Sequence, residues 1–551
     1  MRFYHFLLTV SRNLEIVVMN QMRSTPAIVL LLVISHLGLF AWFSTYTAED
    51  AYIVYRYSEN LVDGNGLVFN PGEPVSALTS PLHALICSGL YAITGESAWT
   101  NKVFAALLHL ACTYLAVQLI QLDRGRLLFF LMVWLSPYMI FWTAGGLETM
   151  YLSSFLVLAF ACSVRSHNTD DHRFMIAFSV LLGLAFLTRY DSCLFTLPIW
   201  FHVAISQWRR AGLTRGKKFV RTVLLLMPGL VIALAWLGTS YVYYQDIFPT
   251  SIYHKPLRYD IQTHAAYYML QFLCLSGIVP LLAWVTIDRI RRPGTRFIGS
   301  LKETTLAKAG VVIGLLIFAF YATTAVLTHM MFSYRFLLPY FPIMALLVIE
   351  LIHRSSPEAW QGGNLGKRSW LWVLLLVIPF QGLQFYLIDQ HSINPGKMGE
   401  YRQLSRRQYC EFIDLLDRQA TAIQEHWQQL DQQRPPQIHA YAAGILPYRY
   451  REAYIVDWGL ISYRKHVNVY SIQPGLLYSS DYIMTLSPRH HGVDYQLQQS
   501  AAGLQLVSHT KMVFDGSEQS FAIWHNPTPI KYRLPTTVDG TAIDPIPKPI
   551  Q

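Results

Sequence analysis

Residues 26–50 read PAIVLLLVISHLGLFAWFSTYTAED, an apolar run that ends in the acidic doublet Glu49-Asp50. About 20 apolar residues suffice for a helix to cross the hydrocarbon core of a bilayer. Carboxylates are costly beside a bilayer, so they persist chiefly in water-filled clefts, in ion pairs or in active sites. The stretch therefore predicts a membrane-spanning helix that delivers two reactive carboxylates to one membrane face.

Apolar runs of similar length recur as far as residue 388, and we predict about eleven membrane spans. They are expected at 25–45, 103–121, 127–142, 149–164, 174–188, 191–207, 222–243, 267–287, 309–329, 335–352 and 369–388. The segment 82–95 is shorter and contains His83, so we predict an interfacial or re-entrant helix there. A chain that is 53% hydrophobic and 14% charged is neither a soluble enzyme nor a disordered protein. The expected fold class is a polytopic α-helical membrane protein.

The basic residues indicate how the spans are oriented. Much of the Lys and Arg content lies in short loops between spans, such as 208–221 and 288–306. Such loops stay cytoplasmic, which explains the formal charge of +10 without a nucleic-acid partner. With Arg23 inside, alternation puts 46–101, 143–148, 188–191, 244–266, 329–334 and the chain after about 389 on the opposite, outer face.

The chain divides into four parts by composition. Residues 1–24 form a cytoplasmic N-terminal segment, 25–388 the transmembrane domain with a first outer loop at 46–101, 389–525 a periplasmic α/β domain, and 526–551 a proline-rich tail. Within the α/β part, 411–430 has helical periodicity, and 438–441, 453–456 and 482–486 are typical of short strands. Five of the six cysteines lie in apolar segments, so no disulfide framework or zinc site is expected.

Polar motifs recur at the outer ends of the predicted spans. They are GGLET at 145–149, TRYD at 188–191 and YYQD at 243–246. Ends that share one membrane face can converge on one site. A structural interpretation is also open, because acidic residues such as Glu49, Asp50 and Glu148 favour helix N-termini. A partly desolvated carboxylate can instead have a raised pKa and act as a general base.

The first outer loop carries a resemblance to a known family. After the doublet come AYI at 51–53, YRY at 55–57, GNGLVFNPGE at 64–73 and TSPL at 79–82, and later GLET, TRYD, YYQDIFPTSIYHK at 243–255, YRFLLP at 334–339, AGILPY at 443–448 and VDWGL at 456–460. This order resembles the GT-C glycosyltransferases, above all the terminal arabinofuranosyltransferase family that decorates mycobacterial cell-wall arabinan. Glu49 stands where that family has Asp, and Tyr190 stands where proline is usual.

The resemblance implies a glycosyltransferase that takes a sugar, arabinofuranosyl or a related pentose, from a polyprenyl-phosphate donor. The implied acceptor is a hydroxyl of a cell-envelope glycan, glycolipid or protein at the outer face of the bacterial inner membrane. Asp50 is the expected general base, with Glu49 second. Donor-phosphate contacts are expected from Arg189, Lys255, Arg335 and Arg56, and substrate contacts from Glu148, Asp191, Asp246, His254, His329 and Tyr244. No cofactor is required, although the outer carboxylates leave a divalent metal open.

Two other classes of protein fit part of the pattern. A transporter or flippase of a lipid-linked sugar would also need many spans, but it predicts broken helices near the middle of the membrane. A non-catalytic membrane protein that binds cell-wall polymer would leave Glu49, Asp50 and Arg189 without a role. The sequence contains no phosphate-binding glycine-rich loop followed by Lys, no His-Glu-x-x-His and no Gly-x-Ser-x-Gly. Charges gathered at one membrane face favour chemistry over transport.

Overall fold

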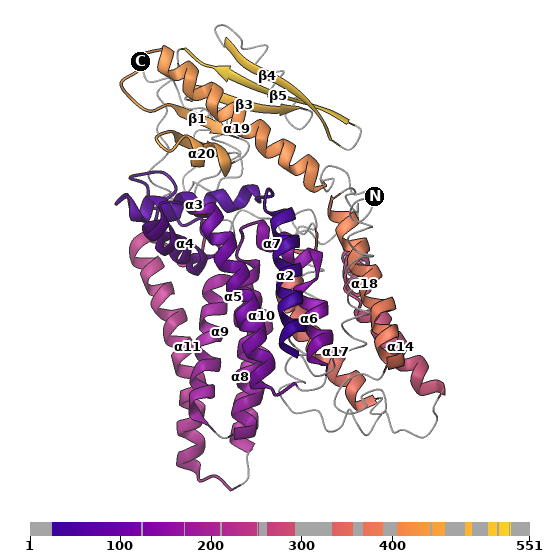
Figure 1. Ribbon diagram of the computed structural model, residues 1–551. Helices are drawn as coiled ribbons and strands as arrows, with labels where there is room; N and C mark the ends of the chain where they lie inside the picture. Colours follow the sequence, from indigo (N-terminus) through magenta and orange to yellow (C-terminus); the bar gives the residue numbers. More distant parts are fainter. Residues whose placement is uncertain are drawn as a thin grey trace.

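The computed structural model describes residues 25–529 apart from several gaps. The gaps are 123–124, 170, 210–211, 251, 253–261, 292–313, 315–332, 356–366, 390–404, 441–442, 458–479, 488–504, 515–516 and 528. Figure 1 shows a bundle of upright helices with a β-sheet and one long helix stacked at one end. Within the described residues the fold is therefore mainly helical, as the sequence predicts.

The helices follow the predicted apolar runs closely. They are α2 (Thr25–Phe43), α3 (Glu49–Val62), α4 (Pro81–Thr94), α5 (Ala98–Leu119), α6 (Arg126–Trp134), α7 (Pro137–Ala144), α8 (Thr149–Thr169), α9 (His172–Thr188), η1 (Tyr190–Ser192), α10 (Cys193–Arg209), α11 (Arg215–Tyr244), α13 (Gln262–Leu275), α14 (Ile278–Arg291), η3 (Leu338–Tyr340), α17 (Phe341–Ser355), α18 (Lys367–Asp389), α19 (Arg406–Gln429) and α20 (Ile445–Arg449). The predicted span 309–329 lies almost wholly outside the described residues.

Length and hydropathy identify four described helices that can cross a membrane, namely α2, α5, α8 and α11. The helices α6 and α7 meet at an angle of 49°, and they add a fifth span if they are counted together as one bent span. The predicted span 127–142 is therefore present as two helices, α6 and α7, with a bend between them. Pro137 begins α7 and cannot donate a backbone hydrogen bond, so the helix breaks just before it. The predicted span 267–287 is likewise divided, into α13 and α14, at Gly277 with φ +81°.

Close backbone contact joins α9 to α11 in the bundle. Gly229 donates its N–H to the Ser179 hydroxyl at 2.9 Å, and a β-carbon on Gly183 would lie 2.9 Å from the Gly229 Cα. Small residues let membrane helices approach in this way. In the best apolar window of α8, 83% of residues are buried, against 17% in that of α11. The helix α8 is therefore central and α11 peripheral.

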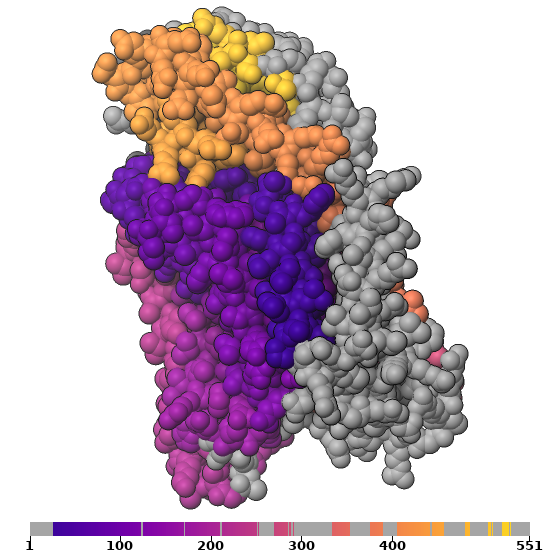
Figure 2. Space-filling model, in the orientation of Figure 1, coloured from indigo at the N-terminus to yellow at the C-terminus, as the bar shows by residue number. Residues whose placement is uncertain are grey.

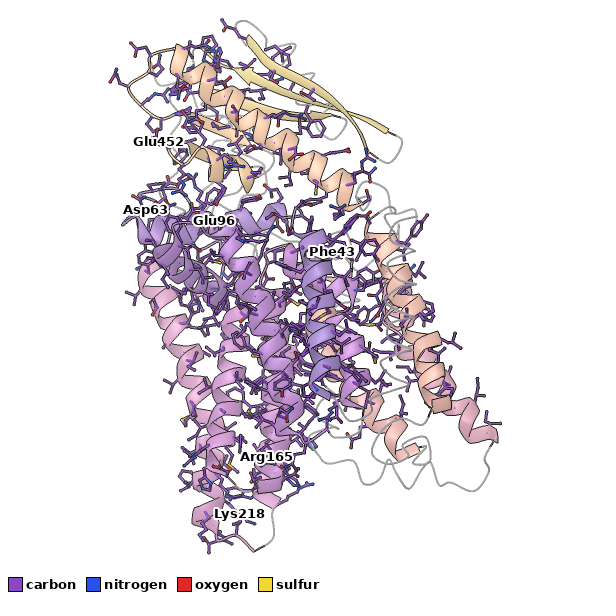
Figure 3. The ribbon with its side chains drawn as sticks, viewed as in Figure 1. Phe43, Asp63, Glu96, Arg165, Lys218 and Glu452 are labelled. Atoms are coloured by element: carbon purple, nitrogen blue, oxygen red, sulfur yellow. The ribbon has the colours of Figure 1, made fainter. Side chains whose placement is uncertain are left out.

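The two ends of the bundle differ in charge. Figure 3 places Arg165 and Lys218 at one end, and Asp63 and Glu96 at the other, beneath Glu452 of the sheet-bearing part. The acidic first loop and the predicted basic loops therefore lie at opposite ends, as the alternation of spans requires. Which end faces the cytoplasm stays a prediction.

Five strands form one mixed sheet in the order β2-β1-β3-β5-β4. They are β1 (Gln437–Ala440), β2 (Tyr454–Asp457), β3 (Tyr482–Ser487), β4 (Gln505–Phe514) and β5 (Ser517–His525). The strand β1 pairs in parallel with β2 and β3, whereas β5 pairs antiparallel with β3 and β4. A capping box formed by Ser405 and Gln408 begins α19, which extends along the sheet (Figure 1). Figure 2 shows this C-terminal part seated on the first-loop residues.

Candidate functional site

Five of the predicted site residues meet where the first loop joins the bundle. Arg335 donates to Asp50 at 3.4 Å and to the Glu148 carboxylate at 3.2 Å. Arg189 donates to the same Glu148 at 2.8 Å and to Asp191 at 2.6 Å. Three carboxylates and two guanidiniums thus form one continuous chain from α3 to η1. Residues distant in sequence meet because the spans that carry them end at the same face.

Glu148 is the centre of this chain. It lies just before α8, and its side chain is 2% exposed. Burial raises the pKa of Glu148, but the guanidiniums of Arg335 and Arg189 more than offset this effect and lower it to about 2. The Glu148 side chain is therefore a negatively charged carboxylate that orients two arginines. Its role is not limited to favouring the N-terminus of the helix that follows.

All three guanidinium nitrogens of Arg189 donate to carboxylates of this cluster. Its Nε and Nη2 donate to the two oxygens of Asp191 at 2.9 and 2.6 Å, while Nη1 donates to Glu148. These paired carboxylates outweigh burial and raise the pKa of Arg189 above its usual range. Such bidentate pairing fixes the planar side chain strongly. Arg189 is therefore held in place by both Glu148 and Asp191.

Arg335 is held more loosely. Its contacts with Asp50 and Glu148 are 3.2–3.4 Å long, and its buried Nε has no hydrogen-bond partner within the part of the chain that the structure describes. Its guanidinium carbon lies 5.6 Å from the ring centre of Trp142 and 5.5 Å from that of Phe336. A guanidinium over aromatic faces, with a free N–H, is suited to an additional oxygen ligand.

The backbone before Arg335 is strained. Ser333 and Tyr334 have φ of +48° and +60°, a conformation that residues other than glycine rarely adopt. The Trp142 indole donates to the Ser333 carbonyl at 3.0 Å and helps to hold this turn. Strain of this kind persists where the surroundings over-determine the backbone, often at functional sites. Here the strained turn delivers Arg335 to the carboxylates.

Glu49 and Asp50 both lie in the first turn of α3, which agrees with the dipole interpretation of the doublet. Their side chains nevertheless have different partners. Asp50 contacts Arg335, whereas Glu49 Oε1 accepts the backbone N–H of Gly444. The Glu49 N–H donates to the Tyr409 hydroxyl at 2.7 Å. The two adjacent carboxylates therefore have different partners: Asp50 contacts an arginine of the cluster, and Glu49 contacts the C-terminal part of the chain.

Other predicted site residues lie away from this cluster or outside the described residues. The prediction that Arg56 contacts the donor phosphate has no support, because its 3% exposed side chain donates to backbone carbonyls of Phe69, Pro447 and Ala453. The hydroxyl of Tyr244 donates to the Leu67 carbonyl, and Asp246 lies beside it after α11. Tyr244 thus supports the first loop, while the backbone carbonyl of Asp246 accepts the Ser240 hydroxyl at 2.9 Å. His254, Lys255 and His329 lie outside the described residues.

Sequence reasoning missed a polar network beneath the cluster. Asn101 donates to the Gly146 carbonyl at 2.9 Å and to Tyr55 at 3.0 Å, and its oxygen accepts from Tyr151 at 2.7 Å and lies 3.1 Å from His83 Nε2. This network fixes the turn that precedes Glu148. The signal was a polar Asn at the start of an otherwise apolar helix. In the described part of the chain, no three His, Cys, Asp or Glu side chains are grouped to hold a metal ion.

The fold of the chain is similar to that of solved structures of other proteins. The structure resembles ArnT from Cupriavidus metallidurans in the apo state, with a TM-score of 0.56, 15% identity, and coverage of 90% of this chain and 97% of that one. ArnT bound to undecaprenyl phosphate matches with a TM-score of 0.51, 14% identity, and 91% and 98% coverage. The Archaeoglobus fulgidus oligosaccharyltransferase in complex with Zn and sulfate matches with a TM-score of 0.51, 10% identity, and 83% and 67% coverage.

At 10–15% identity these matches show a shared overall fold with ArnT and the oligosaccharyltransferase. No protein-family profile and no curated protein sequence matches the chain. The arabinofuranosyltransferase subfamily is therefore not confirmed by the comparisons.

Proposed function

We propose that this protein is a membrane glycosyltransferase that moves a sugar from a polyprenyl-phosphate donor to an acceptor hydroxyl, with Asp50 as general base. The proposal is supported by the fold that the chain shares with ArnT and by a cluster that matches the predicted site. One of the structural neighbours binds undecaprenyl phosphate, a lipid of the class that the donor would leave behind.

The observation that carries the proposal is a gradient of exposure along the cluster. The side chain of Asp50 is 47% exposed, whereas those of Asp191 and Glu148 are 15% and 2% exposed. A general base must reach the proton that it removes. Asp50 is the carboxylate of this cluster that an incoming hydroxyl can approach, while the other two serve the arginines.

The chemistry assigns a task to each group. The acceptor oxygen forms a bond to the anomeric carbon of the donor while the bond from that carbon to the phosphate oxygen breaks. The acceptor proton passes to Asp50, and the lipid phosphate leaves with the electron pair. Arg335, which has donor capacity left, stabilises the charge that develops on the phosphate. Arg189 acts indirectly, because it holds Glu148 and through it Arg335.

The charge balance of the cluster argues for a further cation. Among the described residues, Asp50, Glu148 and Asp191 are paired with two cations, Arg189 and Arg335. A phosphate brought to a cluster with an excess of negative charge is repelled unless another cation compensates. Lys255, predicted from the sequence to contact the donor phosphate, would supply that charge.

The finer parts of the proposal rest on the first-loop resemblance. That resemblance indicates arabinofuranose or a related pentose as the sugar, and a cell-envelope glycan, glycolipid or protein as the acceptor. It also indicates a bacterial inner membrane, and the basic loops favour an orientation in which the site and the C-terminal α/β part face the outer, periplasmic side. We also propose that sugar transfer requires no cofactor.

A flippase of lipid-linked sugars is the second candidate, because the break between α6 and α7 is a feature that transport predicts. The polar contacts at this break are of the kind that stabilise an interrupted helix. His36 Nδ1 lies 2.7 Å from the Trp134 carbonyl, and the Ser136 hydroxyl donates to Gln384 at 3.1 Å. Uncharged side chains that satisfy backbone groups at a helix break explain this arrangement without a transported substrate.

The test uses protein purified into lipid nanodiscs with a panel of radiolabelled polyprenyl-phosphate sugars. Wild type should consume one donor, and Asp50→Asn should abolish turnover without loss of folded protein. Asp63→Asn is the matched control, because Asp63 lies at the same end of the bundle with a 42% exposed side chain. Unchanged turnover in Asp50→Asn would refute the assignment of the base. Lipid flipping without sugar consumption would favour the transporter.

A further inference from the structure

The C-terminal part of the chain reaches the candidate site through Glu49. The Glu49 carboxylate accepts the N–H of Gly444, and the Glu49 N–H donates to the hydroxyl of Tyr409 at 2.7 Å. Gly444 immediately precedes α20, and Tyr409 lies in α19. We call these three residues the Glu49 clasp. It joins the first turn of α3 to two elements about 400 residues away along the chain.

The clasp depends on the absence of a side chain at position 444. A β-carbon on Gly444 would overlap the backbone carbonyl oxygen of Glu49, and the side-chain oxygen Oε1 would lie 2.6 Å from it. The φ of Gly444 is −94°, which any residue can adopt, so only the close approach requires glycine. Both sides of the contact include backbone atoms, and these cannot move aside as a flexible side chain would.

Tyr409 also ties the clasp to the reacting groups. Its ring lies 5.1 Å from that of Tyr46, in an edge-on arrangement. Burial, together with the nearby charges of Glu49 and Asp50, raises the pKa of Tyr409 well above its usual value, so the phenol stays protonated. A neutral hydroxyl can accept the Glu49 N–H and donate its own proton elsewhere.

We infer that Glu49 is a positioning residue, and that its contact with Gly444 sets the Asp50 carboxylate against Arg335. This inference rests on the proposed function and assigns Glu49 a role other than second base. In an α-helix successive side chains diverge by about 100°. When Glu49 is fixed to Gly444, the direction of Asp50 is fixed as well. The C-terminal α/β part is thereby a component of the site, not only a cover over it.

The geometry separates this role from that of a base. The Glu49 Oε1 accepts a backbone N–H, so what it needs is an acceptor oxygen, which glutamine also offers. A base needs a carboxylate that can take up a proton. If Glu49 is a positioning residue, Glu49→Gln should stay active and Glu49→Ala should not. If Glu49 is a base, both variants should be inactive.

The experiment measures kcat and the KM for donor in Glu49→Gln, Glu49→Ala, Gly444→Ala and the double alanine variant. Under the proposal Glu49→Ala and Gly444→Ala each lower kcat about 100-fold with little change in KM, the loss typical of a misplaced catalytic group. The double variant loses no more than either single one, because both break one contact. Glu49→Gln keeps kcat within about fivefold, since only the charge assistance of one hydrogen bond is lost. Gly89→Ala is the control, because a β-carbon there has no neighbour within 4 Å.

Hydrogen exchange of the peptides around 49–53 and 444–450 gives a second readout. Glu49→Ala and Gly444→Ala should speed exchange in both peptides, whereas Gly89→Ala should not. If Glu49→Gln is as inactive as Glu49→Ala, the charge itself matters and the proposal is overturned. If wild type turns over no donor, the proposed function fails, and exchange alone judges the clasp: unchanged exchange in both peptides would overturn it.

Discussion

Replacing Glu148 by glutamine tests the electrostatic centre of the site. Glutamine keeps the shape of the side chain and removes its charge. The guanidiniums of Arg189 and Arg335, which now contact Glu148 at 2.8 and 3.2 Å, would lose their shared anion. Since the Glu148 side chain is only 2% exposed, water would not replace it. The variant should therefore be less stable and less active.

The size of the loss follows from the pKa. The guanidiniums lower the pKa of Glu148 from 4.5 to about 2 despite burial. A shift of this size corresponds to about 3 kcal/mol of stability near neutral pH. Because the folded pKa is the lower one, the contribution is complete above pH 4.5 and disappears as the pH falls towards 2. At low pH the protonated wild type and Glu148→Gln should be equally stable.

The assay is the free energy of unfolding in detergent micelles between pH 7 and pH 2, for wild type and Glu148→Gln. The difference should be about 3 kcal/mol at neutral pH and should vanish near pH 2. Glu452→Gln, an exposed carboxylate at the same end of the molecule, is the control and should show no such convergence (Figure 3). A difference that does not depend on pH, or no difference at pH 7, would refute the reasoning.

Three further changes have defined outcomes. Arg56→Lys should lower the free energy of unfolding by about 3 kcal/mol, because lysine cannot reproduce the fork that holds three backbone carbonyls; Arg407→Lys, with an 83% exposed side chain, should be neutral in the same unfolding assay. Gly229→Ala should cost about 2 kcal/mol in that assay, because its β-carbon would overlap the Ser179 carbonyl oxygen. Gly238→Ala in the same helix has open space and should be tolerated; equal melting of the two glycine variants would contradict the packing argument. Under the proposed function, sugar transfer should persist after treatment with a chelator, and loss of transfer that added Mg²⁺ or Mn²⁺ restores would contradict a metal-free mechanism.

The shared face of the site residues could be predicted from the alternation of the spans, and the first-loop resemblance selected the residues among those on that face. Each membrane span reverses the direction of the chain, so alternate ends share a face. That reasoning brought together Asp50, Glu148, Arg189, Asp191 and Arg335, which the structure joins by ion pairs. Assigning the shared face needs no knowledge of helix packing, only the sign of each turn and the cost of charge beside lipid.

The details that the sequence patterns could not supply have a common physical origin. Hydropathy averages over a window, so it does not register that Pro137 lacks the N–H needed to continue a helix through 135–137. Composition likewise cannot distinguish an arginine that faces a substrate from one that is folded inward. Arg56 appeared in the same loop as the carboxylates, yet its partners Pro447 and Ala453 lie nearly 400 residues later. Only tertiary structure reveals such a pairing.

The acidic doublet shows how one sequence signal can hold two functions. Neighbouring side chains on a helix leave it in directions about 100° apart, and Glu49 and Asp50 have different partners. Asp50 faces Arg335, and Glu49 faces Gly444. The resemblance to the arabinofuranosyltransferases expects Asp at position 49, and the extra methylene of glutamate lengthens the reach towards the C-terminal part of the chain. The departure from the pattern of the family that the first loop resembles thus coincides with the contact that joins the α/β part to the helical bundle. Under the two proposals above, position 49 determines the geometry of the site and Asp50 takes the proton.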